Sequence, residues 1–151
     1  MGFVKVRVGL YNPLQPEKVI EIDAIVDTGA VYSVVRRDFL EKLGVKPLRR
    51  RKFRAFGGYV ERDVGEVGMT LLGERRTVPV IFGEEGDAVV IGVTALEIFG
   101  LEVDVVRGVL KETELTSTIA TSSHSLSHIK KCATLLEKKR IEITIKRASK
   151  F

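Results

Sequence analysis

One acidic residue stands out because it ends an apolar stretch. The segment 24–26 (Ala-Ile-Val) predicts a buried strand, and Asp27, Thr28, Gly29 and Ala30 follow it directly. A carboxylate at the end of a buried strand is partly removed from water, which favours its protonated form. Thr28 can form a local hydrogen bond, and Gly29 lets backbone or substrate come close. The pattern indicates a carboxylate fit for acid–base chemistry, and a strand-end Asp that caps a turn is the alternative interpretation.

A glycine pair marks the second feature. Two extended patterns, 49–56 and 59–72, are separated by Gly57 and Gly58. This arrangement predicts a hairpin with long arms and a tight, mobile turn. An ordinary surface hairpin is the alternative to a functional one.

The third feature is an apolar run that enters a helix through a glycine. Val89-Val90-Ile91 leads to Gly92, and residues 93–99 predict a short helix that ends at Gly100, where a left-handed residue closes a helix. A buried strand that passes through a glycine into a helix allows another segment to approach closely at that glycine.

Two further clusters carry less weight. Residues 49–52 with Arg54 form a basic cluster that could attract nucleic acid or an acidic substrate, but few aromatic residues are interleaved, so a solvated strand face is favoured. His124, His128 and Cys132 lie four apart. Each step of four turns a helix by about 40°, which places Cys132 about 80° from His124, so we expect no metal site there and no cofactor.

Short strands punctuated by glycine fill the first 110 residues. The predicted hairpin of 3–11 and 19–26 precedes the acidic loop, and a short helix over 36–43 is closed by Gly44. Further strands are predicted over 31–35, 77–82, 88–91, 101–103 and 108–110. The expected fold class is mainly β: a closed β-barrel with a long hairpin and one or two short helices.

The character of the chain changes after residue 112. Residues 113–151 predict a Ser/Thr-rich linker and a basic tail, with a possible helix over 124–139 and a possible strand over 141–146. Residues 1–115 hold 17 basic and 18 acidic side chains, whereas 116–151 hold 8 basic and 2 acidic. The net charge of +5 therefore comes from the tail.

Composition limits the classes of protein. A chain of 151 residues with 44% hydrophobic and 30% charged residues is typical of one globular domain. The single cysteine excludes an internal disulfide, and no apolar run is long enough for a membrane span. We expect a cytoplasmic protein. Asn12 and Gln15 are the only amides among many Lys, Arg and Glu residues, which is typical of proteins from thermophiles.

Taken in order, the three features resemble the single-lobed, retroviral-type (retropepsin-like) aspartic peptidases. The matching segments are the loop 27–30, the flap Phe56-Gly57-Gly58-Tyr59 and the stretch 89–96. The segment 96–110, in which Asp104 precedes a turn, looks most like the retroviral-type domain of eukaryotic DNA-damage-inducible shuttle proteins. The resemblance covers about residues 3–112, and it implies a retropepsin-like barrel with a flap hairpin.

The resemblance also implies an activity, an aspartic-type endopeptidase. Amide hydrolysis by water needs one carboxylate to accept a proton and a second, protonated one to polarise the carbonyl. The chain has one Asp-Thr-Gly, and Asp63-Val64-Gly65 lacks the hydroxyl residue. A homodimer would supply Asp27 from each subunit. Thr28, Gly29 and Ala30 would then shape the active-site loop.

The implied substrate is an extended peptide or an unfolded protein held between the flap and the loop as an added strand. Residues 56–59 would form the flap. Val31 and Tyr32 would offer an apolar wall together with Gly92 and Val93. Retroviral enzymes carry an acid and an arginine at the positions of Val31 and Val93; because both are apolar here, no charge is left buried and unpaired, and we expect the two valines to touch.

Two alternatives remain open. The same fold could serve as a noncatalytic dimeric peptide-binding module, in which Asn at position 27 would matter little to binding. The basic tail could instead bind nucleic acid, with a steep salt dependence that disappears when 116–151 is removed. We expect no membrane partner.

Overall fold

Strands make up most of the part of the chain that the structure describes. The computed structural model describes residues 3–114. Within this range the strands are β1 (Val4–Asn12), β2 (Gln15–Val26), β3 (Ser33–Arg36), β4 (Arg49–Ala55), β5 (Gly58–Leu71), β6 (Glu74–Gly83), β7 (Val90–Ile91), β8 (Leu101–Asp104) and β9 (Val109–Glu112). The two helices of this range are α1 (Arg37–Lys42) and α2 (Val93–Phe99).

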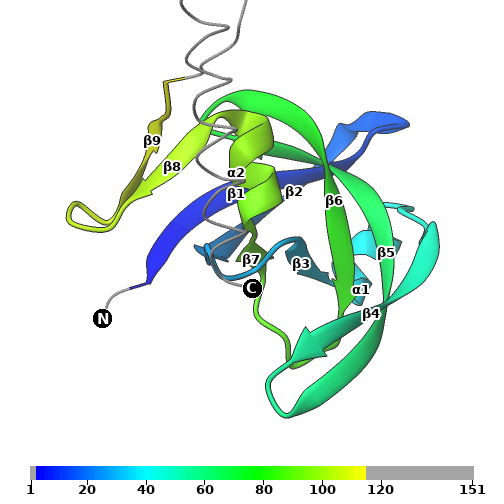
Figure 1. Cartoon of the computed structure of the whole chain (residues 1–151). Coiled ribbons are helices and arrows are strands. Elements are labelled where there is room, and N and C mark those ends of the chain that lie inside the picture. The colour runs from blue at the N-terminus through cyan, green and yellow to red at the C-terminus, as the bar shows by residue number, and fades with distance from the viewer. Residues whose placement is uncertain (1–2, 115–151) are drawn as a thin grey trace, which may run out of the picture. The chain divides into compact units, whose positions relative to one another are not determined.

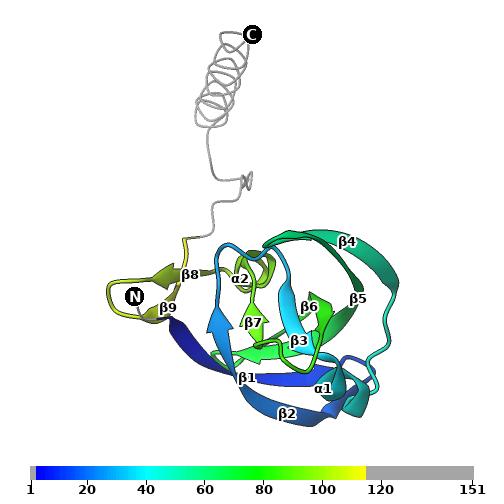
Figure 2. The ribbon, with the colours of Figure 1, turned by 90° about the horizontal axis from the view of Figure 1, so that it is seen from below.

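Seven of these strands form one sheet that closes on itself. The hydrogen-bonded order is β1-β2-β7-β3-β6-β5-β4, and a further antiparallel pairing joins β1 to β5 through Gly9↔Thr70 to Tyr11↔Gly68. The strands that follow one another as β1, β2, β7, β3, β6 and β5 therefore form a ring, which Figure 2 shows from below. β4 pairs only with β5 in this sheet, so it is an edge strand. The predicted mainly β barrel with short helices is confirmed.

The interior of the ring is filled by aliphatic side chains that alternate along the strands. Val8 and Leu10 of β1, Val67 of β5 and Val78 and Val80 of β6 are almost completely removed from water. Each fully buried side chain of this size contributes about 1.5–3 kcal/mol to folding. This core fixes the ends of β2 and β7, from which the candidate site is built.

Both helices lie where the sequence predicts them. Gly44 adopts a φ of 74° after α1, and Gly100 adopts 65° after α2, the left-handed conformation that ends a helix without a Cβ penalty. α2 buries Ala95, Leu96 and Phe99 against the core, and Figure 1 shows it beside β6. These glycines set where each helix gives way to the next segment.

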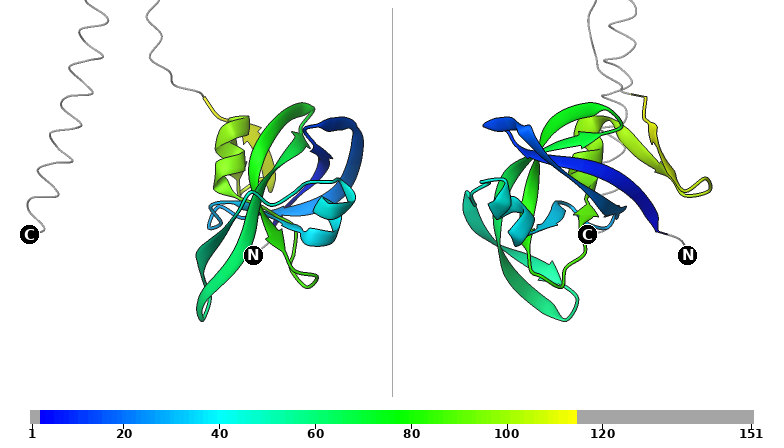
Figure 3. Two further views of the ribbon diagram at one scale, coloured as in Figure 1. Left: turned by 90° about the vertical axis from the view of Figure 1, so that its right-hand side faces the viewer. Right: turned by 180° about the vertical axis from the view of Figure 1, so that it is seen from behind.

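Two hairpins include strands that are not part of the ring. β4 and β5 form a hairpin that projects beyond the other strands (Figure 3). β8 and β9 form a separate two-stranded sheet, and the Asp104 carboxylate accepts hydrogen bonds from the backbone N–H of Val106 (3.1 Å) and Arg107 (3.0 Å) in its turn. The predicted strands 101–103 and 108–110 are thus confirmed in nearly the same places.

One predicted strand is shorter than expected. The apolar run 88–91 forms only the two-residue strand β7. It pairs in parallel with β2 and, through the single pair Val34↔Val90, with β3. Because this strand exists only through partners distant in sequence, its ends could not be read from the local pattern.

The tail predictions lie outside the described residues. The predicted linker and basic tail from residue 115 onward, including the possible helix 124–139 and strand 141–146, fall in the part of the chain the structure does not describe. Neither of the helices within residues 3–114 has the length and apolar character needed to cross a membrane.

Candidate active site

Asp27 stands at the point where β2 leaves the sheet. Its backbone N–H donates to the Ile91 carbonyl at 3.0 Å, the last hydrogen bond between β2 and β7. Its carboxylate Oδ1 accepts from the backbone N–H of Gly29 at 2.8 Å, and its carbonyl accepts from Ala30 at 3.2 Å. The carboxylate therefore shapes its own turn, as Asp commonly does. One of its two oxygens, Oδ2, makes no hydrogen bond within residues 3–114.

The expectation that Asp27 is partly removed from water is wrong for the single chain. Asp27, Thr28 and Gly29 are all exposed. Within β2 only Ala24 and Val26 are buried, and the loop then turns out of the sheet. A low-dielectric surrounding for this carboxylate would have to come from another molecule.

Gly92 is the residue that allows the acidic loop to lie against the start of α2. A Cβ at this position would meet the Tyr32 carbonyl carbon at 2.6 Å, the Tyr32 oxygen at 2.7 Å and the Ala30 oxygen at 2.9 Å. All three are backbone atoms. Next to it, Val93 N–H donates to Ala30 at 2.8 Å and Thr94 N–H to Val31 at 3.0 Å. Only glycine leaves room for these bonds.

A buried hydroxyl adds a further contact between the acidic loop and the start of α2. Ser33 is fully buried, and its Oγ accepts a hydrogen bond from the Gly92 N–H at 3.1 Å. It satisfies a backbone donor that has no other partner between the loop and α2. Sequence reasoning missed Ser33, because its role depends on a contact 59 residues away.

The predicted wall residues lie together, with one contact untested. Val31 is 62% exposed, whereas Tyr32 and Val93 are half-buried and Gly92 is buried. The backbone bonds from Val93 and Thr94 place the two segments side by side. That the side chains of Val31 and Val93 touch stays a prediction.

Tyr32 connects the acidic loop with the β4–β5 hairpin. Its ring meets the Phe53 ring edge-on, with 6.3 Å between centroids and 77° between planes. Its hydroxyl accepts a hydrogen bond from the Arg51 guanidinium at 3.3 Å. The hairpin arm therefore lies over the loop that carries Asp27, as a flap would. The sequence predicts both segments but gives no sign of this contact.

The tip of the hairpin is a two-residue turn. Ala55 pairs with Gly58, so Phe56 and Gly57 form the turn, and Gly57 adopts a φ of 88°. A glycine with positive φ at the second turn position is typical of a type II turn. The Phe56 side chain is fully exposed, and Tyr59 is also largely exposed. An apolar tip in water indicates a surface that another chain can cover.

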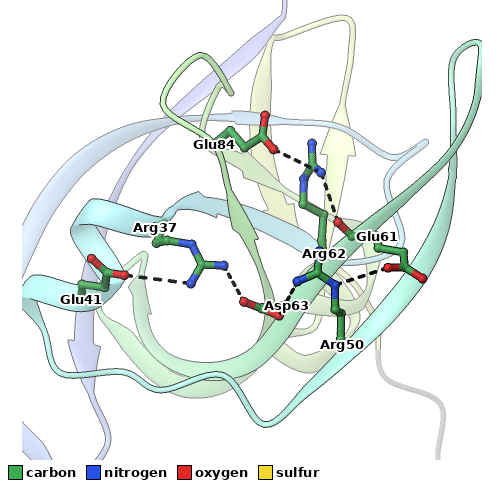
Figure 4. Close-up of polar contacts among 7 residues, drawn as sticks. All are labelled: Arg37, Glu41, Arg50, Glu61, Arg62, Asp63 and Glu84. Carbon is green, nitrogen blue, oxygen red and sulfur yellow. Dashed lines mark hydrogen bonds and ion pairs between the residues drawn. The ribbon is translucent and has the colours of Figure 1, made fainter.

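Asp63, the other Asp-x-Gly acid, belongs to an ion-pair network (Figure 4). Its side chain is 20% exposed and contacts Arg37 of α1 at 2.5 Å and Arg50 of β4 at 3.8 Å. On the same hairpin, Arg62 contacts Glu84 at 3.3 Å. Asp63 thus holds the base of the hairpin to α1, and it is not brought beside Asp27 by any contact within residues 3–114.

Two clefts lie elsewhere on the barrel. One, of about 480 Å³, is lined by Arg36, Arg37, Asp38, Glu41, Gly83, Glu84 and Glu85; the other, of about 390 Å³, is lined by Asn12, Pro13, Leu14, Gly44, Val45, Lys46, Leu48 and Glu66. Neither includes Asp27. Among the residues the structure describes, no three His, Cys, Asp or Glu side chains are grouped to hold a metal, and the His124–Cys132 cluster lies outside them.

Comparison with known proteins supports the fold. No protein-family model matches the chain, and no curated protein does. Among solved structures, the chain is similar to EIAV protease complexed with the inhibitor HBY-793, with 17% sequence identity and a TM-score of 0.53. The match covers 69% of this chain and 94% of the EIAV chain. The protein has a retropepsin-like fold.

Proposed function

We propose that the protein is one subunit of a homodimeric aspartic endopeptidase, in which a pair of Asp27 carboxylates activates water to hydrolyse a peptide bond. The observation that carries the proposal is the position of Asp27. Asp27 directly follows β2, in a loop whose position is held by contacts at Gly92 and Ser33. The fold is similar to that of EIAV protease.

The need for two subunits follows from the chemistry. One carboxylate must accept a proton from the attacking water while a second, protonated carboxyl polarises the substrate carbonyl. The loop of one chain supplies one exposed carboxylate, and Asp63 is engaged by two arginines. A symmetric dimer would bring two Asp27 loops to its axis and remove both from water. Two carboxyls held that close together could divide the two roles, one accepting the proton from water and the other polarising the carbonyl.

The hairpin would hold the substrate. An extended peptide lying under β4 and β5 can hydrogen-bond to the backbone near Gly57 and Gly58, in the manner of an added strand. Phe56 at the exposed tip would close over it. Val31, Tyr32 and Val93 would then face its apolar side chains. We assign this function to residues 1–112, with 113–151 as an appended linker and tail.

Substitution of the carboxylate tests the proposal. The purified protein is incubated with a mixed library of unfolded peptides from about pH 3 to 8, beside Asp27→Asn, and products are identified by mass spectrometry. We expect cleavage at apolar sites that Asp27→Asn abolishes while peptide binding persists. Binding without cleavage by the folded wild-type dimer would support the noncatalytic peptide-binding module instead, and cleavage retained by Asp27→Asn would refute the assignment.

A further inference from the structure

We propose that Arg51 and Tyr32 form a subsite for an acidic side chain of the substrate, so that the enzyme prefers peptides with Glu or Asp at one position beside the cleaved bond. This inference rests on the proposed function and names a class of substrate for it.

The first step is the direction in which Arg51 points. Side chains alternate along a strand, so Arg51 and Phe53 share one face of β4. Both contact Tyr32, at 3.3 Å for the Arg51 guanidinium and 6.3 Å between the two rings. This face of the hairpin is therefore the one turned to the Asp27 loop, where a peptide would lie.

The second step is the balance of charge on that face. Arg62 lies directly opposite Arg51 in the β4–β5 register, and it is paired with the exposed carboxylate of Glu84 at 3.3 Å. Within residues 3–114 no carboxylate forms an ion pair with Arg51. Of the two guanidinium groups on this face, Arg62 is thus paired with a carboxylate and Arg51 is not.

The other face of β4 is different. Arg50, Lys52 and Arg54 alternate with Arg51 and lie away from the Asp27 loop. Arg50 contacts Glu61 at 3.4 Å and Asp63 at 3.8 Å, as Figure 4 shows. Lys52 lies 4.7 Å from the centre of the Tyr59 ring. The basic cluster is solvated on this side, as predicted, and Arg51 is exposed as well, on the face turned to the Asp27 loop.

The third step is the kind of group that fits. The Tyr32 oxygen accepts from Arg51, so its own O–H is left to donate. Arg51 has further N–H groups in a planar fork that matches a carboxylate. The pair offers mainly N–H and O–H donors, and an ionised carboxylate is the side chain that only accepts. An amide of the same shape would place an N–H against these donors, so the site should discriminate Glu from Gln.

The test compares matched peptides. A peptide that the wild-type protein cleaves is prepared with acetylated and amidated ends, and Glu or Gln is placed at each position in turn. Because both ends are uncharged, the Glu and Gln peptides differ only in the side-chain carboxylate. We expect one position at which Glu gives about tenfold higher kcat/KM than Gln, the factor that corresponds to about 1.4 kcal/mol.

Variants of β4 assign the preference. Arg51→Gln should reduce the Glu/Gln ratio to about one, and Arg51→Lys, which keeps the charge without the fork, should give an intermediate ratio. Arg54→Gln is the matched control, because it removes the same charge from the opposite face of the same strand. Loss of the preference in Arg54→Gln as well would show a general attraction of charge and overturn the subsite.

Failure of the inference and failure of the proposed function give different results. Cleavage of Glu and Gln peptides at equal rates overturns the subsite and leaves the peptidase intact. If no peptide is cleaved, the proposal that the protein is a peptidase is refuted. Peptide affinity then tests the subsite. Labelled Glu and Gln peptides are titrated against Asp27→Asn by fluorescence anisotropy; about tenfold tighter binding of Glu, lost with Arg51→Gln, is expected, and equal affinities refute it.

Discussion

Replacement of Gly92 by Ala should displace the Asp27 loop. The added Cβ would lie 2.6 Å from the Tyr32 carbonyl carbon, and an ordinary contact begins at 3.4 Å, so backbone must move by about 0.8 Å. That movement is enough to break the bonds from Val93 to Ala30 (2.8 Å) and from Thr94 to Val31 (3.0 Å). Overpacking costs about 1–3 kcal/mol and each of the two lost bonds about 1 kcal/mol, so we expect a loss of about 3–5 kcal/mol.

Urea unfolding at fixed protein concentration measures this loss, because the proposed dimerisation would make the apparent stability depend on concentration. With an m-value of about 2 kcal/mol/M, the midpoint should fall by about 1.5–2.5 M. Gly86→Ala is the matched control, since a Cβ there has no neighbour within 4 Å. We expect that variant to stay within about 1 kcal/mol of wild type. A Gly92→Ala protein as stable and as active as Gly86→Ala would refute the idea that backbone contact at Gly92 positions the loop.

Three further predictions address the flap, the network and the last hairpin. Asp63→Asn should cost about 1–2 kcal/mol in urea unfolding because its arginines lose their partner, yet peptide cleavage should persist; abolished cleavage in a folded variant would make this acid catalytic. Gly57→Ala and Gly73→Ala, at φ of 88° and 80° in open space, should each cost about 1 kcal/mol, but only Gly57→Ala should lower kcat/KM, since only its turn belongs to the flap; equal rates would contradict that role. A hydrogen bond from the Lys111 ammonium, helped by one from Thr113 and by the Lys111 charge, lowers the pKa of the Glu102 carboxyl from its ordinary value, so their pairing stabilises the folded hairpin above the usual carboxyl range and is lost as pH falls through the lowered pKa. NMR titration of the Glu102 side-chain carboxyl should give a midpoint that rises in Lys111→Met, and an unchanged midpoint would contradict the pairing.

Local sequence patterns are enough to predict many of the helices and strands. The helix 93–99 and its closing Gly100 were predicted at the observed residues, because apolar spacing and a left-handed glycine are local signals. The N-terminal hairpin and the hairpin of β4 and β5 were predicted for the same reason. β7 was predicted too long, because its two paired residues are selected by β2 and β3 and not by their own neighbours.

In the candidate site, too, some residues can be predicted from the local sequence and others cannot. Asp27 and Gly92 are visible in the sequence because each sits at the end of a distinctive apolar run. The buried Ser33 hydroxyl and the contacts of Tyr32 with Arg51 and Phe53 are not, because they join segments far apart in the chain. The exposure of the acidic loop was also missed, since burial of a strand end depends on what covers it.

Subunit mixing tests the paired carboxylates most directly. Wild-type protein and Asp27→Asn are mixed in equal amounts, unfolded and refolded together at constant total concentration, and peptide cleavage is compared with wild type treated alone. If each site needs Asp27 from two subunits, only wild-type dimers are active, and random pairing predicts about a quarter of the wild-type rate. About half of that rate would show that each chain carries a complete site, and it would contradict the account.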